Sequence, residues 1–128
     1  MWNEEKPMAM HNRSMGIIGE RLAADFMENS GYRILATNFR CPLGEIDIVA
    51  EKGPLVAVVE VKTRQDEYCG RPAQAVNIRK QRKIADTAMW FLRSKKMDYR
   101  PCRFDVIEVI IPKAGKIIIN HIEEAFEC

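Results

Sequence analysis

The segment from residue 44 to residue 64, GEIDIVAEKGPLVAVVEVKTR, places charged side chains inside two strongly apolar runs. Glu45 and Asp47 are two residues apart in the first run, and Glu60 and Lys62 are two residues apart in the second. Side chains at that spacing lie on one face of a strand, so each pair shares a face. Burying a carboxylate costs roughly several kcal/mol unless it is paired or binds a metal. One lysine cannot neutralise three acids, so the pattern favours a hard divalent cation such as Mg²⁺.

The turn between the two runs decides whether the acids converge. A two-residue turn at 52–53 places Glu60 opposite Glu45, and the glycine there can adopt the positive backbone angle that such a turn requires. A four-residue turn at 52–55 places Glu60 opposite Asp47 instead. Either even loop brings all three acids and the lysine onto one face, whereas an odd loop without a bulge separates them.

The same charges also suit an arrangement without a metal. In that interpretation the acids lie at solvated strand ends and pair with Lys62 and Arg64. The second run is apolar on both faces from Leu55 to Val59, which is typical of a central strand. Carboxylates on a central strand need more compensation than one cation supplies, so the metal site is the hypothesis taken forward.

Two helices and five strands are expected to position these residues. Residues 1–13 lack periodicity and are expected to form a flexible arm before a single domain spanning 14–128. The first helix is predicted to begin at the capping Ser14 and to end at Gly31. Its predicted apolar stripe consists of Ile18, Leu22 and Phe26, with Gly16, Gly19 and Ala23 beside it.

The order of the remaining runs predicts a mixed sheet. Three runs rich in β-branched or aromatic residues, 32–40, 44–51 and 55–64, indicate an antiparallel meander. A second helix is predicted to open at the capping Asn77 and to bury Ile84, Ala85, Ala88, Phe91 and Leu92. Strands are expected at 103–111 and 116–120, followed by a terminal helical turn at 121–126. A long helix between the third and fourth strands is what a parallel crossover requires.

Basic residues gather at the start of the second predicted helix, where the helix dipole disfavours cations. They are Arg79, Lys80, Arg82 and Lys83. With Arg64, they are candidate contacts to the phosphates of a nucleic acid, although a solvated helix face would look the same. Trp90 lies on the same helix face as Arg79 and Lys83, away from the apolar stripe. Base stacking and a contact between two copies both remain open for it, and the homodimer contact is preferred.

Composition limits the class of protein. Twenty basic and eighteen acidic residues give a formal charge of +2 over 128 residues, too small a balance to establish a nucleic-acid partner by itself. No apolar run reaches the length of a membrane span, so no membrane partner is expected. The four cysteines are too widely spaced for paired zinc-ligand motifs. These features predict a cytoplasmic protein.

Several motifs carry a more specific resemblance. GERLAADFM, GYRILATNFR, GEIDIVA, VVEVKTR, GRPAQAV, RKQRKI, RFDVIEV and HIEEAF stand in the order and spacing of the YraN-type family. These small bacterial proteins are similar to Holliday-junction resolvases and other nucleases. The resemblance covers about residues 16–126 and implies an α/β, restriction-endonuclease-like fold with a mixed central sheet flanked by helices.

The resemblance also implies roles for individual residues. Asp47 and Glu60 would be ligands of Mg²⁺ or Mn²⁺, and Lys62 would position or activate the attacking water. Supporting site residues would be Glu45, Glu20 and Gln74. The implied activity is hydrolysis of phosphodiester bonds in nucleic acid, with structured or branched DNA as the substrate. The alternatives are a non-catalytic nucleic-acid-binding module with a structural metal site, and a protein-interaction domain that uses the basic helix and Trp90.

Overall fold

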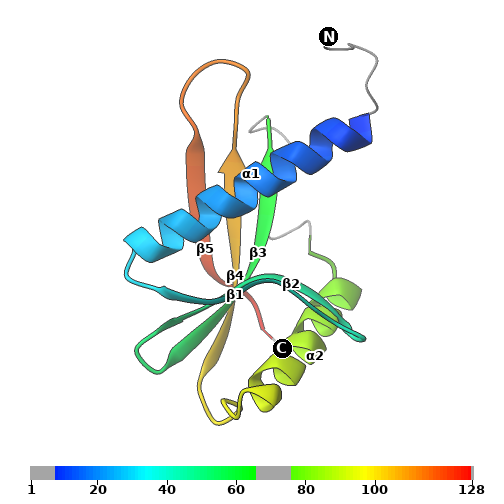
Figure 1. The fold of residues 1–128 in the computed structure, drawn as a ribbon, viewed down its shortest axis with the longest axis vertical. Coiled ribbons are helices and arrows are strands. Elements are labelled where there is room, and N and C mark those ends of the chain that lie inside the picture. The colour runs from blue at the N-terminus through cyan, green and yellow to red at the C-terminus, as the bar shows by residue number, and fades with distance from the viewer. Residues whose placement is uncertain (1–7, 66–75, 128) are drawn as a thin grey trace.

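The chain forms a five-stranded sheet with one helix on each face (Figure 1). The computed structural model describes residues 8–65 and 76–127. In chain order the elements are α1 (Met8–Asn29), β1 (Arg33–Cys41), β2 (Gly44–Lys52), β3 (Leu55–Arg64), α2 (Ile78–Ser94), β4 (Cys102–Ile110) and β5 (Ile118–Phe126). This arrangement confirms the predicted α/β class.

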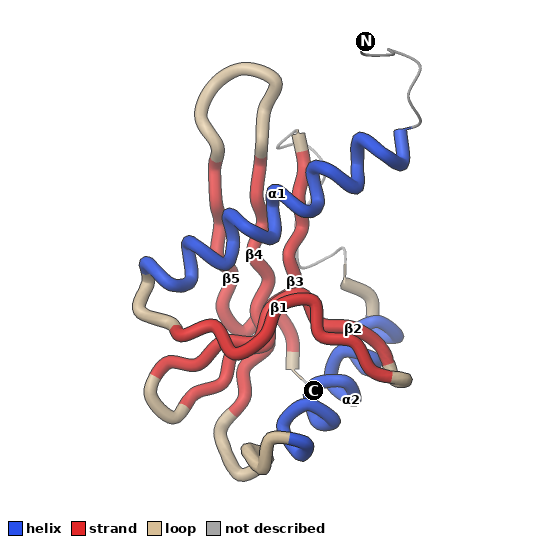
Figure 2. The backbone as a smooth tube through the Cα atoms, viewed as in Figure 1, coloured by secondary structure: helices blue, strands red, loops and turns tan. Residues whose placement is uncertain are grey.

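The sheet is mixed, as predicted. Its strand order is β1-β2-β3-β4-β5, so β3 is the central strand. The β1–β2 and β2–β3 pairs are antiparallel, β3 and β4 are parallel, and β4 and β5 are antiparallel. In Figure 2, β3, β4 and β5 run side by side while β1 and β2 curve across them. The chain passes through α2 between the parallel strands, as a crossover requires.

Alternation along β3 divides the core into two layers. Val56 and Val58 join the apolar cluster under α2, whereas Ala57 and Val59 join the cluster under α1. All four side chains are buried, which confirms that β3 is covered on both faces. Continuing this alternation places Glu60 and Lys62 on the α2 side of the sheet.

Helix α1 differs from the prediction at its start and in its buried face. It begins at Met8 rather than at Ser14, because residues 8–15 contain no glycine or proline to interrupt a helix. Its fully buried residues are Gly19, Ala23 and Met27, whereas Ile18 is 51% exposed. The small residues therefore face the sheet. A Cβ at position 19 would collide with the side chain of Thr63, so glycine is what permits this close approach of α1 to β3.

The C-terminal segment was predicted as a helical turn, and this prediction is wrong. Residues 121–126 continue β5, which pairs with β4 as far as Phe126. The pairing shifts register between Phe104 and Val106, and Glu124 adopts a φ of 52°. Long-range strand pairing thus overrides the local helical pattern, with a bulge that re-aims the end of the strand.

The β2–β3 turn follows the register of the longer alternative. Lys52 pairs with Leu55, so Gly53 and Pro54 form the turn and Gly53 adopts a φ of 58°. The pairing continues to Ile48 and Val59. One further step would set Glu60 opposite Asp47 rather than opposite Glu45, but the ladder itself ends at Ile48 and Val59.

Helix α2 begins as predicted. The Asn77 side chain caps it by accepting a hydrogen bond of 2.9 Å from the backbone N–H of Lys80. Its buried face contains Ile84, Thr87, Ala88, Phe91 and Leu92. The tip of the β1–β2 hairpin lies on this helix, since a Cβ at Gly44 would approach the Thr87 hydroxyl to 2.8 Å. The Asn77 cap thereby fixes the first turn of α2, which carries Lys80.

Candidate active site

The candidate site lies where β2 separates from β3. The ladder between these strands ends at Ile48 and Val59. Beyond that point the backbone N–H of Val61 donates a hydrogen bond of 2.8 Å to Oδ2 of Asp47. A side chain of β2 therefore replaces the strand's own backbone as the partner of β3. This bond fixes the Asp47 carboxylate in the fork between the strands.

Glu60 meets Asp47 in this fork. The side chain of Glu60 is only 12% exposed. Burial, the charge of Asp47 and a hydrogen bond to the Asp47 carboxyl group together raise the pKa of Glu60 to about 7. Two carboxylates this close repel each other when both are ionised, which is why the neighbouring Asp47 charge favours the protonated form of Glu60.

Two lysines flank the acid pair. Nζ of Lys80, on α2, lies 3.6 Å from Oε1 of Glu60. Burial and a hydrogen bond with Lys80 lower the pKa of Lys62, although the charges of Glu60 and Asp47 oppose the shift. Burial alone would lower the pKa of Lys80 too, but its bonds and charge attractions to Lys62 and the two acids outweigh burial and raise it. The pKa values of the two lysines are therefore shifted in opposite directions, down for Lys62 and up for Lys80.

Glu20 reaches the same region from α1. It shares a cavity of about 330 Å³ with Asp47, and the cavity is also lined by Thr37 and Asn38 of β1. Burial and the charge of Asp47 raise the pKa of Glu20, while a hydrogen bond with the Asn38 side chain lowers it. The predicted supporting residue Glu20 is therefore close enough to Asp47 for their charges to interact.

Two other predicted site residues, Glu45 and Arg64, form ion pairs with residues outside the acid pair. Glu45 is at the surface, where its carboxylate lies 3.2 Å from Nε of Arg40. Arg64, predicted to contact nucleic acid, is only 11% exposed and pairs with Glu108 at 3.3 Å. Gln74 lies outside the described residues. The structure therefore brings Asp47, Glu60, Lys62 and Glu20 together and holds Arg64 in a buried ion pair.

The basic cluster of α2 continues from the acid pair onto the surface. Lys80 touches Glu60, whereas Arg79, Arg82 and Lys83 are exposed. The first turn of α2 contains no acidic residue that would offset these charges. One helix terminus therefore links the acid pair to a positively charged surface.

Two features of the site were missed at the sequence level. Asn38 stands in a strand yet adopts a φ of 51°, a conformation that asparagine tolerates better than most residues. An asparagine within a strand pattern is the signal that could have drawn attention to it. Lys80 was assigned only to phosphate binding, because strand and helix periodicity do not tell where the start of α2 meets β3.

A buried polar network lies on the α1 side of the sheet. Asp105 is fully buried and accepts two hydrogen bonds of 2.7 Å from Arg103, one from each of Nε and Nη2. His121 Nε2 lies 2.8 Å from Oδ2, and the Glu124 N–H donates to Oδ1 at 3.1 Å. Arg103 also donates to the hydroxyl of Tyr32. Because its partners satisfy Asp105 at the β4–β5 bulge, this network supports the fold.

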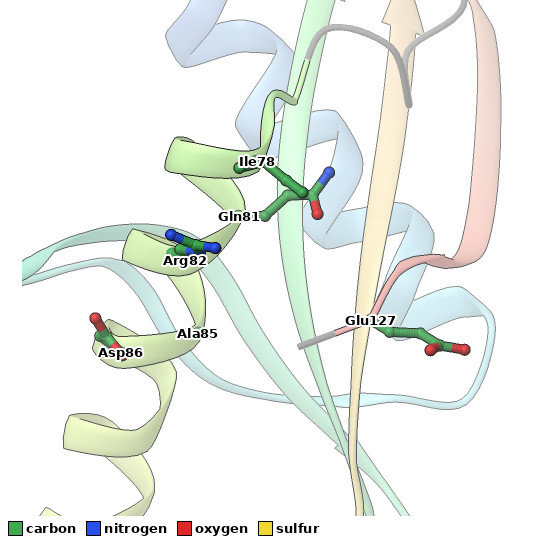
Figure 3. A pocket seen from close by; sticks show the side chains of 6 residues that line it. All are labelled: Ile78, Gln81, Arg82, Ala85, Asp86 and Glu127. Carbon is green, nitrogen blue, oxygen red and sulfur yellow. The ribbon is translucent and has the colours of Figure 1, made fainter.

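A larger hollow beside α2 offers no comparable chemistry. It measures about 470 Å³ and is lined by Ile78, Gln81, Arg82, Ala85, Asp86 and Glu127. Figure 3 shows Glu127 pointing away from the α2 side chains. None of the lining residues belongs to β2 or β3, so this hollow is separate from the acid pair.

In 8–65 and 76–127, no three His, Cys, Asp or Glu side chains are grouped so that they could hold a metal ion. Neither helix of this part of the chain has the length and apolar character needed to cross a membrane.

The mixed sheet with α1 and α2 on opposite faces is a restriction-endonuclease-like α/β fold. Residues 19–109 match the family described as Uncharacterised protein family UPF0102, which is the YraN family, and the chain belongs to it. A UPF0102 protein of Alkaliphilus metalliredigens is 44% identical over 115 residues, covering 90% of this chain and 99% of the relative. One from Dictyoglomus thermophilum is 41% identical over 109 residues, covering 85% and 92%. One from Clostridium botulinum is 48% identical over 101 residues, covering 78% and 82%. The resemblance to this family is confirmed.

Proposed function

We propose that the protein is a Mg²⁺-dependent endonuclease that hydrolyses phosphodiester bonds in nucleic acid. One observation carries this proposal: the carboxyl groups of Asp47 and Glu60 meet in the fork between β2 and β3, beside the amines of Lys62 and Lys80. Phosphodiester hydrolysis needs a cation site, a proton acceptor for water and positive charge near the phosphate, and these residues supply each of them.

The two acids fit Mg²⁺ or Mn²⁺. Both cations prefer oxygen ligands, and Mg²⁺ commonly binds one or two carboxylates plus waters and phosphate oxygens. The charge of Asp47 helps raise the pKa of Glu60, so a cation bound between the two carboxyl groups would offset their repulsion. Asp47 and Glu60 would hold the ion, which would lower the pKa of a water and offset charge on the phosphoryl oxygens.

The remaining side chains have distinct roles in this scheme. The Val61 N–H holds the Asp47 carboxylate in place. Lys62 is the candidate to position or activate the attacking water, since it lies beside the acid pair and burial lowers the pKa of its amine. Lys80 keeps its charge and is available to the phosphate.

The exposed basic residues support a nucleic acid as the substrate. Arg79, Arg82 and Lys83 extend from Lys80 along the first turns of α2, so a phosphate backbone bound there would reach the acid pair. The likeness to Holliday-junction resolvases makes structured or branched DNA the expected form. Arg64 is left out of this surface because it is buried against Glu108.

Incubation with linear, single-stranded and branched substrates in Mg²⁺ or Mn²⁺ tests the proposal. Wild type should cleave at least one substrate, most rapidly a branched DNA, and chelation of the metal should stop cleavage. Asp47→Asn should abolish cleavage without unfolding the protein. Glu123→Gln, at an exposed carboxylate on β5, is the control and should retain activity. Binding of both metal and nucleic acid with no cleavage in the panel would favour the binding module instead.

A further inference from the structure

The outward face of α2 changes character after its basic first turns. Asp86, Met89, Trp90 and Arg93 recur at spacings of three and four residues, so they form one stripe along the helix. Trp90 is 45% exposed and Met89 is 39% exposed. In Figure 3 the Asp86 carboxylate points away from β3 and β4. The stripe therefore consists of two exposed apolar side chains between an acid and a base.

The tip of the β1–β2 hairpin extends this apolar surface. Leu43 is 46% exposed and lines a hollow of about 530 Å³ together with the four stripe residues and Ser94. The tip is held against α2, since Gly44 lies too close to the Thr87 hydroxyl for a larger side chain. Leu43 is thus fixed beside Trp90 rather than carried on a free loop.

The charges at the two ends of the stripe have no ion-pair partner within the described part of the chain. None of the ion pairs in 8–65 and 76–127 involves Asp86 or Arg93. Other charged residues of the fold, by contrast, are paired across strands, such as Arg33 with Glu51. The stripe thus offers one unpaired charge of each sign at a fixed separation, around an apolar centre.

We propose that this surface binds a second copy of the chain, with the two α2 helices antiparallel about a twofold axis that passes between Met89 and Trp90. Asp86 stands three residues before Met89, and Arg93 stands three residues after Trp90. The axis therefore brings Asp86 of each copy beside Arg93 of the other, and Met89 beside Trp90. A twofold contact requires such self-complementarity, and this stripe has it in the order of its charged and apolar residues.

Other occupants fit the stripe less well. Parallel pairing of the helices would set Asp86 against Asp86 and Arg93 against Arg93, which repel each other. A nucleic acid would have its phosphates repelled by Asp86, and the basic residues available to it lie earlier in α2. One helix face and a hairpin tip make a small interface, so the association should be weak and concentration-dependent.

Exchanging the charges at positions 86 and 93 tests the antiparallel geometry specifically. Sedimentation velocity over a range from micromolar to millimolar protein should show the wild type passing from monomer to dimer. Asp86→Arg alone places like charges together, and so does Arg93→Asp alone, so each variant should dimerise at least roughly tenfold more weakly. An equimolar mixture of the two variants should form a heterodimer, because every contact then joins opposite charges. Tyr99→Ala, at a residue that is 82% exposed beyond the end of α2, is the control and should dimerise like the wild type.

Three results would overturn the proposal. The first is a wild type that stays monomeric at millimolar concentration. The second is a wild-type dimer with no recovery in the variant mixture, which would place the interface elsewhere. The third is a Trp90→Ala variant that keeps the wild-type oligomeric state but loses nucleic-acid affinity, which would assign the tryptophan to base stacking. Each variant changes an exposed side chain, so circular dichroism should confirm an intact fold before the comparison.

Discussion

The carboxyl groups of Asp47 and Glu60 meet where β2 and β3 diverge, and the charge of Asp47 helps raise the pKa of Glu60. The Val61 N–H holds one side of the pair, and Lys80 touches the other. Buried acids in contact are costly to ionise together, and natural proteins keep such pairs chiefly at sites that bind cations or move protons. Their proximity therefore has consequences that can be measured both with and without metal.

Stability should fall with rising pH in the metal-free protein. The folded-state pKa of Glu60 is about 7, above the ordinary value of 4.5, so folding favours the protonated form. Stability from this group is fully present below pH 4.5 and is lost as the pH rises toward 7, by about 3 kcal/mol at most. Glu60→Gln should remove this loss, so urea denaturation should find the variant more stable than wild type at pH 8 but not at pH 4.

The exposed acid Glu45 provides the control for that experiment. Glu45→Gln changes the same chemistry at a side chain that is 63% exposed, and its pH profile should follow that of wild type. Saturating Mg²⁺ should restore the stability of wild type at pH 8 but not further stabilise Glu60→Gln. Identical profiles for wild type and Glu60→Gln would show that the two acids do not interact as described.

Lys62 and Asp47 should have separable effects. Asp47→Asn removes a ligand charge and should weaken divalent-metal binding and cleavage together. Lys62→Met keeps the apolar stem and removes the amine, so metal binding should persist or tighten while cleavage falls by orders of magnitude. Titration calorimetry with Mn²⁺ and single-turnover cleavage rates provide the two measurements. Equal cleavage by Lys62→Met and wild type would remove Lys62 from the chemistry.

The basic start of α2 should account for most nucleic-acid affinity. Reversing Arg79 and Lys83 to Glu should weaken binding to all sequences and flatten its dependence on salt, as loss of phosphate contacts does. Fluorescence anisotropy at several salt concentrations measures both effects. Reversing Lys113 and Lys116 gives the same change in net charge on the loop between β4 and β5, far from α2 in Figure 1. If both double variants lose affinity equally, net charge rather than this surface explains binding.

The Asp105 network should stabilise the fold at neutral pH and fail in acid. Burial alone would raise the pKa of Asp105, but hydrogen bonds from His121, Arg103 and the Glu124 backbone hold it below the usual 3.8. The stability that Asp105 contributes is fully present above pH 3.8. It is lost as the pH falls through the lower pKa that Asp105 has in the folded protein. Asp105→Asn should cost about 3 to 5 kcal/mol at pH 7, because Arg103 is left without its buried partner.

A neighbouring acid of the same network gives the matched comparison. Glu123 lies 3.6 Å from Nη1 of Arg103 but is 57% exposed. Glu123→Gln should therefore change stability by less than about 1 kcal/mol, because water screens an exposed pair. Thermal denaturation at pH 7 and pH 3 should show the cost of Asp105→Asn shrinking in acid. A cost that does not change with pH would mean that packing, not charge, holds the bulge.

Strand periodicity predicted most of what now surrounds the acid pair. Alternation along β2 and β3 and an even turn predicted that Asp47, Glu60 and Lys62 would meet, and they do meet at the fork where the two strands separate, although the register stayed open between two turns. Periodicity could not reveal Lys80 or Asn38 as neighbours of the acids. The first depends on where α2 is seated, and the second on one residue with a positive φ.

The two incorrect secondary-structure predictions, at Ser14 and at 121–126, have a common physical origin. In both cases a local sequence signal was outweighed by the neighbouring residues or by long-range strand pairing. At Ser14 the capping signal did not start the helix, because the preceding residues also favour helix. At 121–126 the helical pattern gave way to pairing with β4, and the buried Asp105 secures the bulge that this pairing needs.

Anomalous scattering from crystals soaked in Mn²⁺ tests the central claim most directly, because the claim is that Asp47 and Glu60 form a divalent-cation site. Wild type should show a peak bounded by the carboxylate oxygens of these two residues, at about 2.0 to 2.3 Å from each. The same soak of Asp47→Asn should lose that peak. A wild-type map without density between the two carboxylates, or with its peak at other residues, would contradict the account.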